Sequence, residues 1–111
     1  MIGYLTREEE KIIKQFKKQL LQEYPGQIIS IIVYGSKARG DHQPESDIDV
    51  LVIVKKDDWN FFDAIRRRGY ELDADIDYKM SIQVMTQQKF EYLQENGFQF
   101  IQNILRDAVK A

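Results

Sequence analysis

The first part of the chain places apolar residues among charged ones at the spacing of a helix. Thr6 followed by Glu9 matches a capping box, in which each side chain accepts from the other residue's backbone N–H. Apolar residues then recur at intervals of three and four, at Ile12, Ile13, Phe16, Leu20 and Leu21. Tyr24-Pro25-Gly26 breaks the pattern, so the sequence predicts one helix that ends there.

Three more segments show helical spacing in the second half of the chain. One follows a cap at Asp57 or Asp58 and carries Phe61, Phe62, Ile65 and Leu72. The next is capped by Thr86, closed by Asn96-Gly97, and carries Phe90 and Leu93. Residues 98–111 are predicted to form a final amphipathic helix with an apolar stripe of Phe98, Ile101, Leu105 and Ala108.

Three apolar segments between these helices have the composition of strands. Ile28–Tyr34 is β-branched and almost wholly apolar, as expected of a strand covered on both faces. Ile48–Val54 is a second such strand and continues from Asp47. Asp77–Met85 alternates, which places Tyr78, Met80, Ile82 and Val84 on one face.

The resulting order is helix, strand, strand, helix, strand, helix, helix. This order predicts a single domain over residues 1–111 of the α/β or α+β class, with helices packed against a small mixed sheet. The loop over residues 35–45 is polar and has room for one helical turn.

Composition narrows the functional classes. The chain has 111 residues, 43% of them hydrophobic and 31% charged, as in ordinary globular proteins. It has no cysteine, which excludes disulfides and thiolate metal sites. It also has no apolar run long enough to span a membrane, and we expect a cytoplasmic protein. A net charge of −2 argues against general nucleic-acid binding.

Two aspartates stand at the start of the second strand, where apolar residues are expected. Asp47 and Asp49 point to the same face, about 6–7 Å apart at Cα. Carboxylates this close repel each other, and a hard divalent cation such as Mg²⁺ relieves the repulsion and recruits phosphates. The structural alternative is that the pair caps the exposed end of an edge strand, with Ser46 bonding the backbone.

A small turn precedes the aspartates by twelve residues. Gly35-Ser36 directly follows the first strand, and such a turn allows close backbone approach to phosphate. Arg39 lies in the same loop and is either a forked phosphate donor or a surface arginine. A plain turn is the alternative for Gly35-Ser36.

Together these residues read G-S-x-A-R-G-x(5)-S-D-x-D, from Gly35 to Asp49. This pattern resembles the signature of minimal nucleotidyltransferases (the MNT domain), which belong to the DNA polymerase β-like superfamily. The resemblance implies the polymerase β-like nucleotidyltransferase fold. It also implies ATP as nucleotide donor and Mg²⁺, as two ions, as cofactor.

The resemblance also assigns roles to individual residues. It implies that Asp47 and Asp49 are the catalytic metal ligands and that Gly35 and Ser36 cradle the β- and γ-phosphates. Ser46 is expected to orient the loop, and Arg39 to steady phosphates or brace the turn. Active members of the family carry a third carboxylate on the next strand. Here we expect that place to hold Gln83, which has no charge, while Asp77 points to the same face roughly 20 Å earlier.

Two other residues are weaker candidates for the site. His42 is the only histidine and lies in the loop near the aspartates, where we expect a solvated residue rather than a base. Trp59 is a candidate for stacking on adenine, but a tryptophan opening an amphipathic helix is more often a packing residue.

Two functions follow. In the first, the protein transfers AMP from ATP to a hydroxyl, and the resemblance implies a helical HEPN-type partner silenced by this antitoxin. In the second, a binding module of the same fold neutralises a partner by forming a complex, with little or no chemistry. The intact Gly35–Asp49 signature favours the first function and Gln83 the second. The broad apolar surface of residues 98–105 is expected to be an interface, with a partner or a second copy, or to close the sheet.

Overall fold

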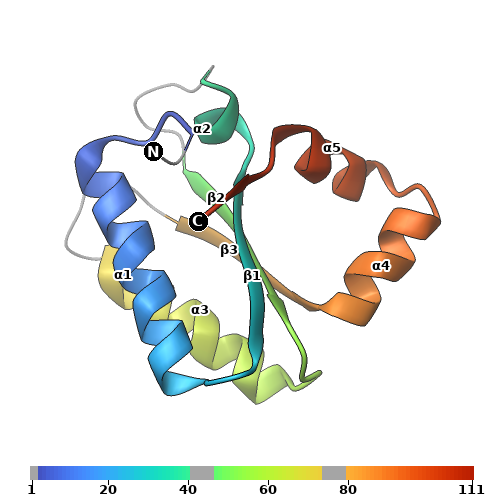
Figure 1. Ribbon diagram of the computed structural model, residues 1–111, viewed down its shortest axis with the longest axis horizontal. Coiled ribbons are helices and arrows are strands. Elements are labelled where there is room, and N and C mark those ends of the chain that lie inside the picture. The colour runs from blue at the N-terminus through green and yellow to red at the C-terminus, as the bar shows by residue number, and fades with distance from the viewer. Residues whose placement is uncertain (1–2, 41–46, 74–79) are drawn as a thin grey trace.

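Two antiparallel strands, β1 (Ile28–Tyr34) and β2 (Ile48–Val54), form the middle of a four-stranded sheet (Figure 1). β3 (Met80–Thr86) lies parallel to β2 on one side, and β4 (Val109–Lys110) lies antiparallel to β1 on the other. The computed structural model describes residues 3–40, 47–73 and 80–111, without the side chains of Ser36 and Asp73. The mixed sheet confirms the predicted fold class.

Helices cover both faces of this sheet (Figure 1). α1 (Arg7–Glu23) and α3 (Trp59–Asp73) pack on one face, while α4 (Gln87–Glu95) and α5 (Gln99–Asp107) pack on the other. α2 (Ser36–Arg39) is a single turn directly after β1. None of the described helices combines the length and the apolar character needed to cross a bilayer.

The predicted helix starts are confirmed. Thr6 and Glu9 form the capping box of α1, with Thr6 N–H donating to Glu9 Oε1 at 2.8 Å. Asp58 Oδ1 accepts from the backbone N–H groups of Asn60 and Phe61, and Thr86 Oγ1 accepts from Lys89 N–H at 3.1 Å. The bounds of β1 and β2 are also those predicted.

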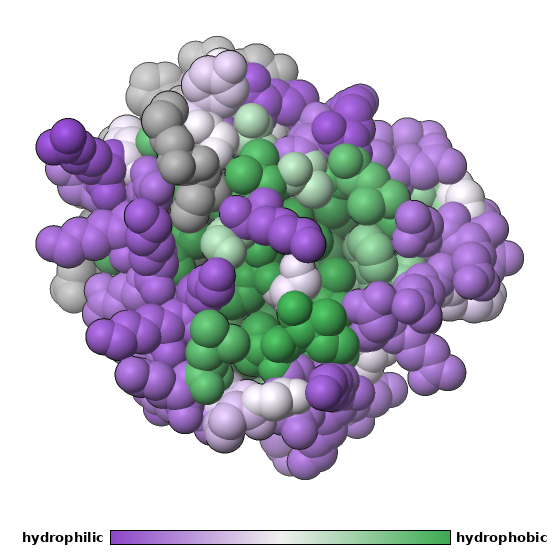
Figure 2. Space-filling view, in the orientation of Figure 1, coloured by the Kyte–Doolittle hydropathy of each residue, from purple (hydrophilic) through white to green (hydrophobic). Residues whose placement is uncertain are grey.

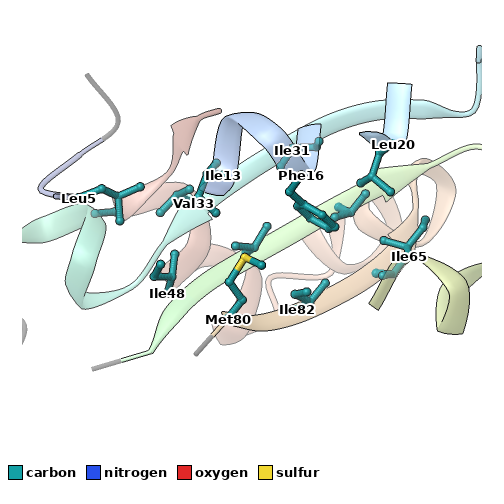
Figure 3. Close-up of a cluster of buried hydrophobic side chains, with 14 of the residues drawn as sticks. Leu5, Ile13, Phe16, Leu20, Ile31, Val33, Ile48, Ile65, Met80 and Ile82 are labelled. Carbon is teal, nitrogen blue, oxygen red and sulfur yellow. The ribbon is translucent and has the colours of Figure 1, made fainter. Parts of the chain in front are cut away.

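The alternation along β2 divides the core into two clusters. Its even-numbered positions, Ile48 to Val54, face α1 and α3, where they pack on Ile13, Phe16 and Leu20 (Figure 3). Leu51 and Ile53 face α4 and α5, where they pack on Phe90, Ile101 and Ile104. Because Asp49 is odd-numbered like Leu51, it lies on the α4–α5 face, and Asp47 directly precedes the strand.

The prediction for the C-terminal segment is wrong in part. The helix ends at Asp107, Ala108 is extended, and Val109–Lys110 forms β4 beside Ile32 and Val33. The edge of β1 offers backbone partners that a continued helix would leave unused. The stripe is also different: Ile101 and Ile104 are buried against the sheet, whereas Phe98 and Leu105 are exposed.

Candidate active site

A row of three side chains crosses the sheet at the start of β2. Asp49 lies opposite Tyr34 on β1 and opposite Ser81 on β3, so all three share the α4–α5 face. Asp49 is half-buried within this row, and Asp47 is exposed at its margin. We call Tyr34, Asp49 and Ser81 the Asp49 row.

Gly35 lies directly against the Asp49 carboxylate. Its φ of +76° is in the left-handed region that favours glycine. A Cβ added at Gly35 would overlap Oδ2 of Asp49, so a larger residue here would displace the carboxylate. The Gly35 carbonyl accepts from Ala38 N–H and Arg39 N–H, both at 3.1 Å, which starts the turn of α2.

The electrostatics of the row reflect its burial. Desolvation and then the neighbouring charge of Asp47 raise the pKa of Asp49, while Arg39 acts in the opposite direction. Burial, with a further contribution from Asp49, raises the pKa of Tyr34 to about 12. Negative charge at this place is therefore costly unless a cation or a strong donor compensates it.

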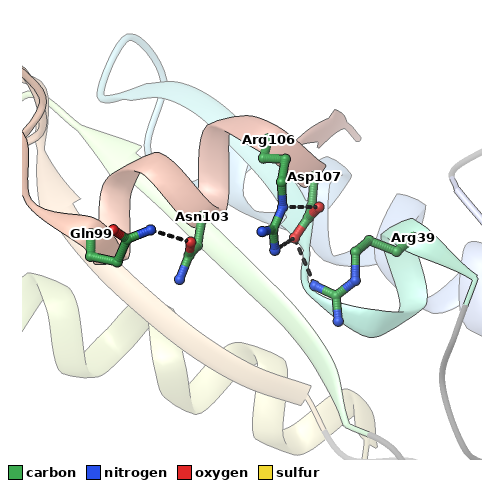
Figure 4. Close-up of polar contacts among 5 residues, drawn as sticks. All are labelled: Arg39, Gln99, Asn103, Arg106 and Asp107. Atoms are coloured by element: carbon green, nitrogen blue, oxygen red, sulfur yellow. Dashed lines mark hydrogen bonds and ion pairs between the residues drawn. The ribbon is translucent and has the colours of Figure 1, made fainter.

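Arg39 binds the C-terminal end of α5 (Figure 4). Its Nη1 is 2.7 Å from Oδ2 of Asp107, whose side chain is 5% exposed, against 37% for Arg39. Arg106 Nε also binds the Asp107 carboxylate, at 3.1 Å. This ion pair links α2 to α5 and so braces the turn that follows β1. The predicted contact of Arg39 with phosphate stays a prediction.

A buried ion pair holds α2 from the other side, and sequence reasoning missed it. Lys37 Nζ is 2.7 Å from Oε2 of Glu9, with side chains 2% and 0% exposed. The backbone N–H of Tyr4 also donates to the Lys37 carbonyl at 3.0 Å. The signal was present in the sequence, because Glu9 shares a helical face with Ile13, Phe16 and Leu20, where a lone acidic residue needs a partner.

β3 contains Gln83, the position predicted for the third carboxylate. Ser81 lies opposite Asp49, and Gln83 lies one step farther along, opposite Leu51. Both residues share the face of Asp49, and neither carries charge. Asp77 falls outside the described residues. Within the described parts of the chain, no group of three or more His, Asp or Glu side chains is arranged to hold a metal ion.

Other predicted site residues are placed as follows. Ser36 begins α2, whereas Ser46 and His42 lie outside the described residues. Trp59 begins α3 beyond the far end of β2, so it lies at the opposite end of the strand from Asp47 and cannot stack on a nucleotide held there. The packing role favoured for Trp59 is also wrong, because its side chain is 74% exposed.

Comparison with known proteins identifies related sequences. Residues 13–110 match the family model described as nucleotidyltransferase domain. The candidate protein adenylyltransferase MJ0604 of Methanocaldococcus jannaschii is 53% identical over 45 residues, which are 40% of this chain and 45% of that protein. An aminoglycoside nucleotidyltransferase (4′) of Staphylococcus aureus is 34% identical over 74 residues, 66% of this chain and 29% of that enzyme. The matched segment thus spans less than half of these relatives.

Solved structures share the fold. A candidate nucleotidyltransferase of Sulfolobus solfataricus superposes with a TM-score of 0.55 at 23% identity, covering 90% of this chain and 76% of the other. A toxin–antitoxin structure with AMP-PNP superposes with a TM-score of 0.57 at 16% identity, covering 87% and 70%. At these identities the likeness shows the fold alone.

Proposed function

The chain belongs to the nucleotidyltransferase domain family, and we propose that it transfers AMP from ATP to a hydroxyl group of a partner protein. The observation that carries this proposal is the contact between Gly35 and Asp49. It places a glycine backbone and two carboxylates within one small region at the start of β2. The turn and the two carboxylates together form a site for a triphosphate and a cation.

The residues present fit Mg²⁺. Asp47 and Asp49 supply hard oxygen ligands on one face of the strand, and burial makes the Asp49 charge costly without a counter-ion. When bound there, Mg²⁺ would neutralise phosphate charge and acidify the attacking hydroxyl. The substitution Gly35→Ala would fill the space beside Asp49, so the cradle depends on glycine at this position.

The chain's own residues orient the reactants. Gly35 allows phosphate oxygens to approach the main chain, and the ion pairs of α2 with Glu9 and Asp107 hold the turn in place. The positive charge of Arg39 acts on Asp49 from the same loop and would also attract the triphosphate. Tyr34 stays protonated at neutral pH, so it faces the row as a neutral hydroxyl.

The acceptor is proposed from the relatives. Several matched sequences are named as candidate protein adenylyltransferases, and two structural neighbours are toxin–antitoxin structures, one of them with AMP-PNP. These similarities support ATP as donor and a protein hydroxyl as acceptor. A helical HEPN-type toxin, with this chain as its antitoxin, is the acceptor that we propose.

One observation favours a second function. The polar β3 residues on the face of Asp49, Ser81 and Gln83, cannot act as a base or as an anionic metal ligand. A chain with two carboxylates in the described site would then neutralise its partner by forming a complex, with little nucleotidyl transfer.

The test is label transfer from [α-³²P]ATP with Mg²⁺ to co-purified partner protein. The enzyme hypothesis predicts a labelled protein band that disappears with Asp47→Asn and with Asp49→Asn. Asp57→Asn is the matched control, because Asp57 is an exposed aspartate after the far end of β2. We expect this variant to label normally.

The outcomes separate the two functions. If the wild-type chain labels nothing but still forms a stoichiometric complex, the binding module is correct and the enzyme proposal fails. If label persists in both Asp variants, the assignment of the site to the Asp49 row is wrong.

A further inference from the structure

A groove lies between α1 and the edge of β1, away from the Asp49 row. Two adjoining hollows share Lys17, Leu21 and Ala111 and together form this groove. Figure 2 shows apolar side chains gathered over the middle of this side of the molecule, with hydrophilic side chains around them. We call it the β1 groove.

The floor of the β1 groove is apolar. Leu21 is 45% exposed and Ile29 is 42% exposed, although both adjoin the larger core cluster through Leu20 and Ile28. Ile29 is the extra residue of a β-bulge, because the register with β2 passes from Ile28 to Ser30 without it. The exposed side chain of Ile29 is therefore available to a ligand.

The rim of the β1 groove is basic. Four lysines line it, and none of its lining residues, all of which the structure describes, is acidic: the lysines are Lys14, Lys17, Lys18 and Lys110. Lys17 Nζ already donates to a main-chain oxygen, the carbonyl of Ala111, at 2.9 Å.

β4 shows how an extended segment lies on this edge. It pairs antiparallel to β1 beside Ile32 and Val33, and Ala111 N–H donates to the Ile31 carbonyl at 2.9 Å. A segment that continues along this line next meets Ser30 and then Ile29, on the floor of the groove. Addition of a strand to a sheet edge is a common mode of peptide recognition.

We propose that the β1 groove binds an extended, acidic segment of a partner protein. Its alternate apolar side chains would pack on Leu21 and Ile29, and its carboxylates would meet the lysines of the rim. An apolar floor distinguishes this surface from one that binds nucleic acid, which needs phosphate contacts over most of its area.

Such a segment would leave the Asp49 row open. Ile29 and Tyr34 are five residues apart on β1, or about 17 Å in an extended strand. Docking and chemistry are therefore separate, and the inference does not depend on nucleotidyl transfer.

The probe for the test is a fluorescein-labelled heptapeptide in which Glu and Val alternate, titrated with the full chain and followed by fluorescence anisotropy. We expect it to bind at least about tenfold more tightly than the same peptide with Lys in place of Glu. A version with Pro at the central Val cannot donate to the strand edge and should bind about tenfold more weakly.

Substitutions in the β1 groove test whether the peptide binds there. Lys17→Glu/Lys18→Glu and, separately, Ile29→Asp should each weaken binding about tenfold. Lys89→Glu, at an exposed position of α4, is the charge control and should leave binding unchanged, as should Asp49→Asn. Circular dichroism confirms that each variant is folded.

Several results would overturn the proposal. These are equal binding of the acidic and basic peptides, full affinity in Lys17→Glu/Lys18→Glu, or displacement of the peptide by single-stranded DNA. Sedimentation that shows a dimer dissolved by Ile29→Asp would mean that a second copy fills the β1 groove instead.

Discussion

Glu9 and Lys37 form an ion pair with both charges buried, joined by 2.7 Å between Oε2 and Nζ. Glu9 also caps α1 through its other oxygen, so one carboxylate serves both the helix start and the turn after β1. A buried pair is weak support for stability in itself, but removal of one partner leaves a buried charge alone. The pair therefore makes the position of α2 sensitive to single substitutions.

The first prediction concerns these two residues. Glu9→Gln, which keeps an oxygen for Thr6 N–H, should lower the free energy of unfolding by about 3–5 kcal/mol. Lys37→Met should lower the free energy of unfolding by a similar amount. The double variant should recover much of the loss, because it removes both charges. Urea denaturation measures all three, and a double variant less stable than either single one would contradict the ion-pair account.

The second prediction is the acid dependence of stability. Burial alone would raise the pKa of Glu9, but hydrogen bonds from Lys37 and Thr6 and the charge of Lys37 lower it below its usual 4.5. A lowered pKa in the folded state contributes stability that is present above pH 4.5. This stability is lost as the pH falls through the lowered pKa. Urea denaturation between pH 6 and 3 should show a shallower acid loss in Glu9→Gln than in the wild type. Equal slopes would contradict the shift.

The third prediction uses Tyr34. Its pKa is raised from 10.0 to about 12, so the unfolded chain ionises first and stability falls as the pH rises from 10 to 12. A metal-free absorbance titration at 295 nm should show Tyr34 ionising late. Tyr34→Phe should remove that late step. Asp49→Asn should shift it downward, because the Asp49 charge contributes to the shift.

The fourth prediction compares two glycines with the same backbone conformation. Gly35 and Gly26 have φ values of +76° and +77°, but a Cβ at Gly26 has nothing within 4 Å, whereas one at Gly35 overlaps Asp49. Gly26→Ala should cost about 1 kcal/mol of stability and leave label transfer intact. Gly35→Ala should in addition lower transfer at least about tenfold. Equal activity in the two variants would remove Gly35 from the site.

The fifth prediction tests the missing carboxylate. Ser81 lies next to Asp49 across the ladder, about 4.8 Å away at Cα. Ser81→Asp should therefore raise Mg²⁺ affinity, measured by calorimetry, about tenfold. Gln83→Asp is the matched control, one step farther along the same face, and should gain less. A larger gain in Gln83→Asp would support the position expected from the sequence.

The register between β2 and β3 could not be predicted from the sequence. Alternation in β3 correctly put Ser81 and Gln83 on one face, because a strand has a period of two. A slip by two residues keeps every side chain on its face, so alternation cannot distinguish Ser81 from Gln83 as the neighbour of Asp49. That choice depends on packing between elements, which no local pattern contains.

The prediction for the C-terminal segment was wrong for a related reason. Ala108, Val109 and Lys110 continue the helical spacing, yet they form β4 because β1 presents backbone partners from about 77 residues earlier in the chain. By contrast, β1 and β2 are runs of β-branched residues whose burial follows from their own composition, and their bounds were predicted correctly. The motif residues Gly35, Asp47 and Asp49 were likewise accessible to sequence reasoning, because they are close together in the chain.

The ion pair between Arg39 and Asp107 has a consequence for synthesis of the protein. These residues are 68 positions apart, so Arg39 leaves the ribosome long before its partner exists. A growing chain can form the contact of Lys37 with Glu9 early, but it lacks the brace from α5 until it has reached Asp107. The turn beside Asp49 therefore gains this brace only after α5 has been synthesised.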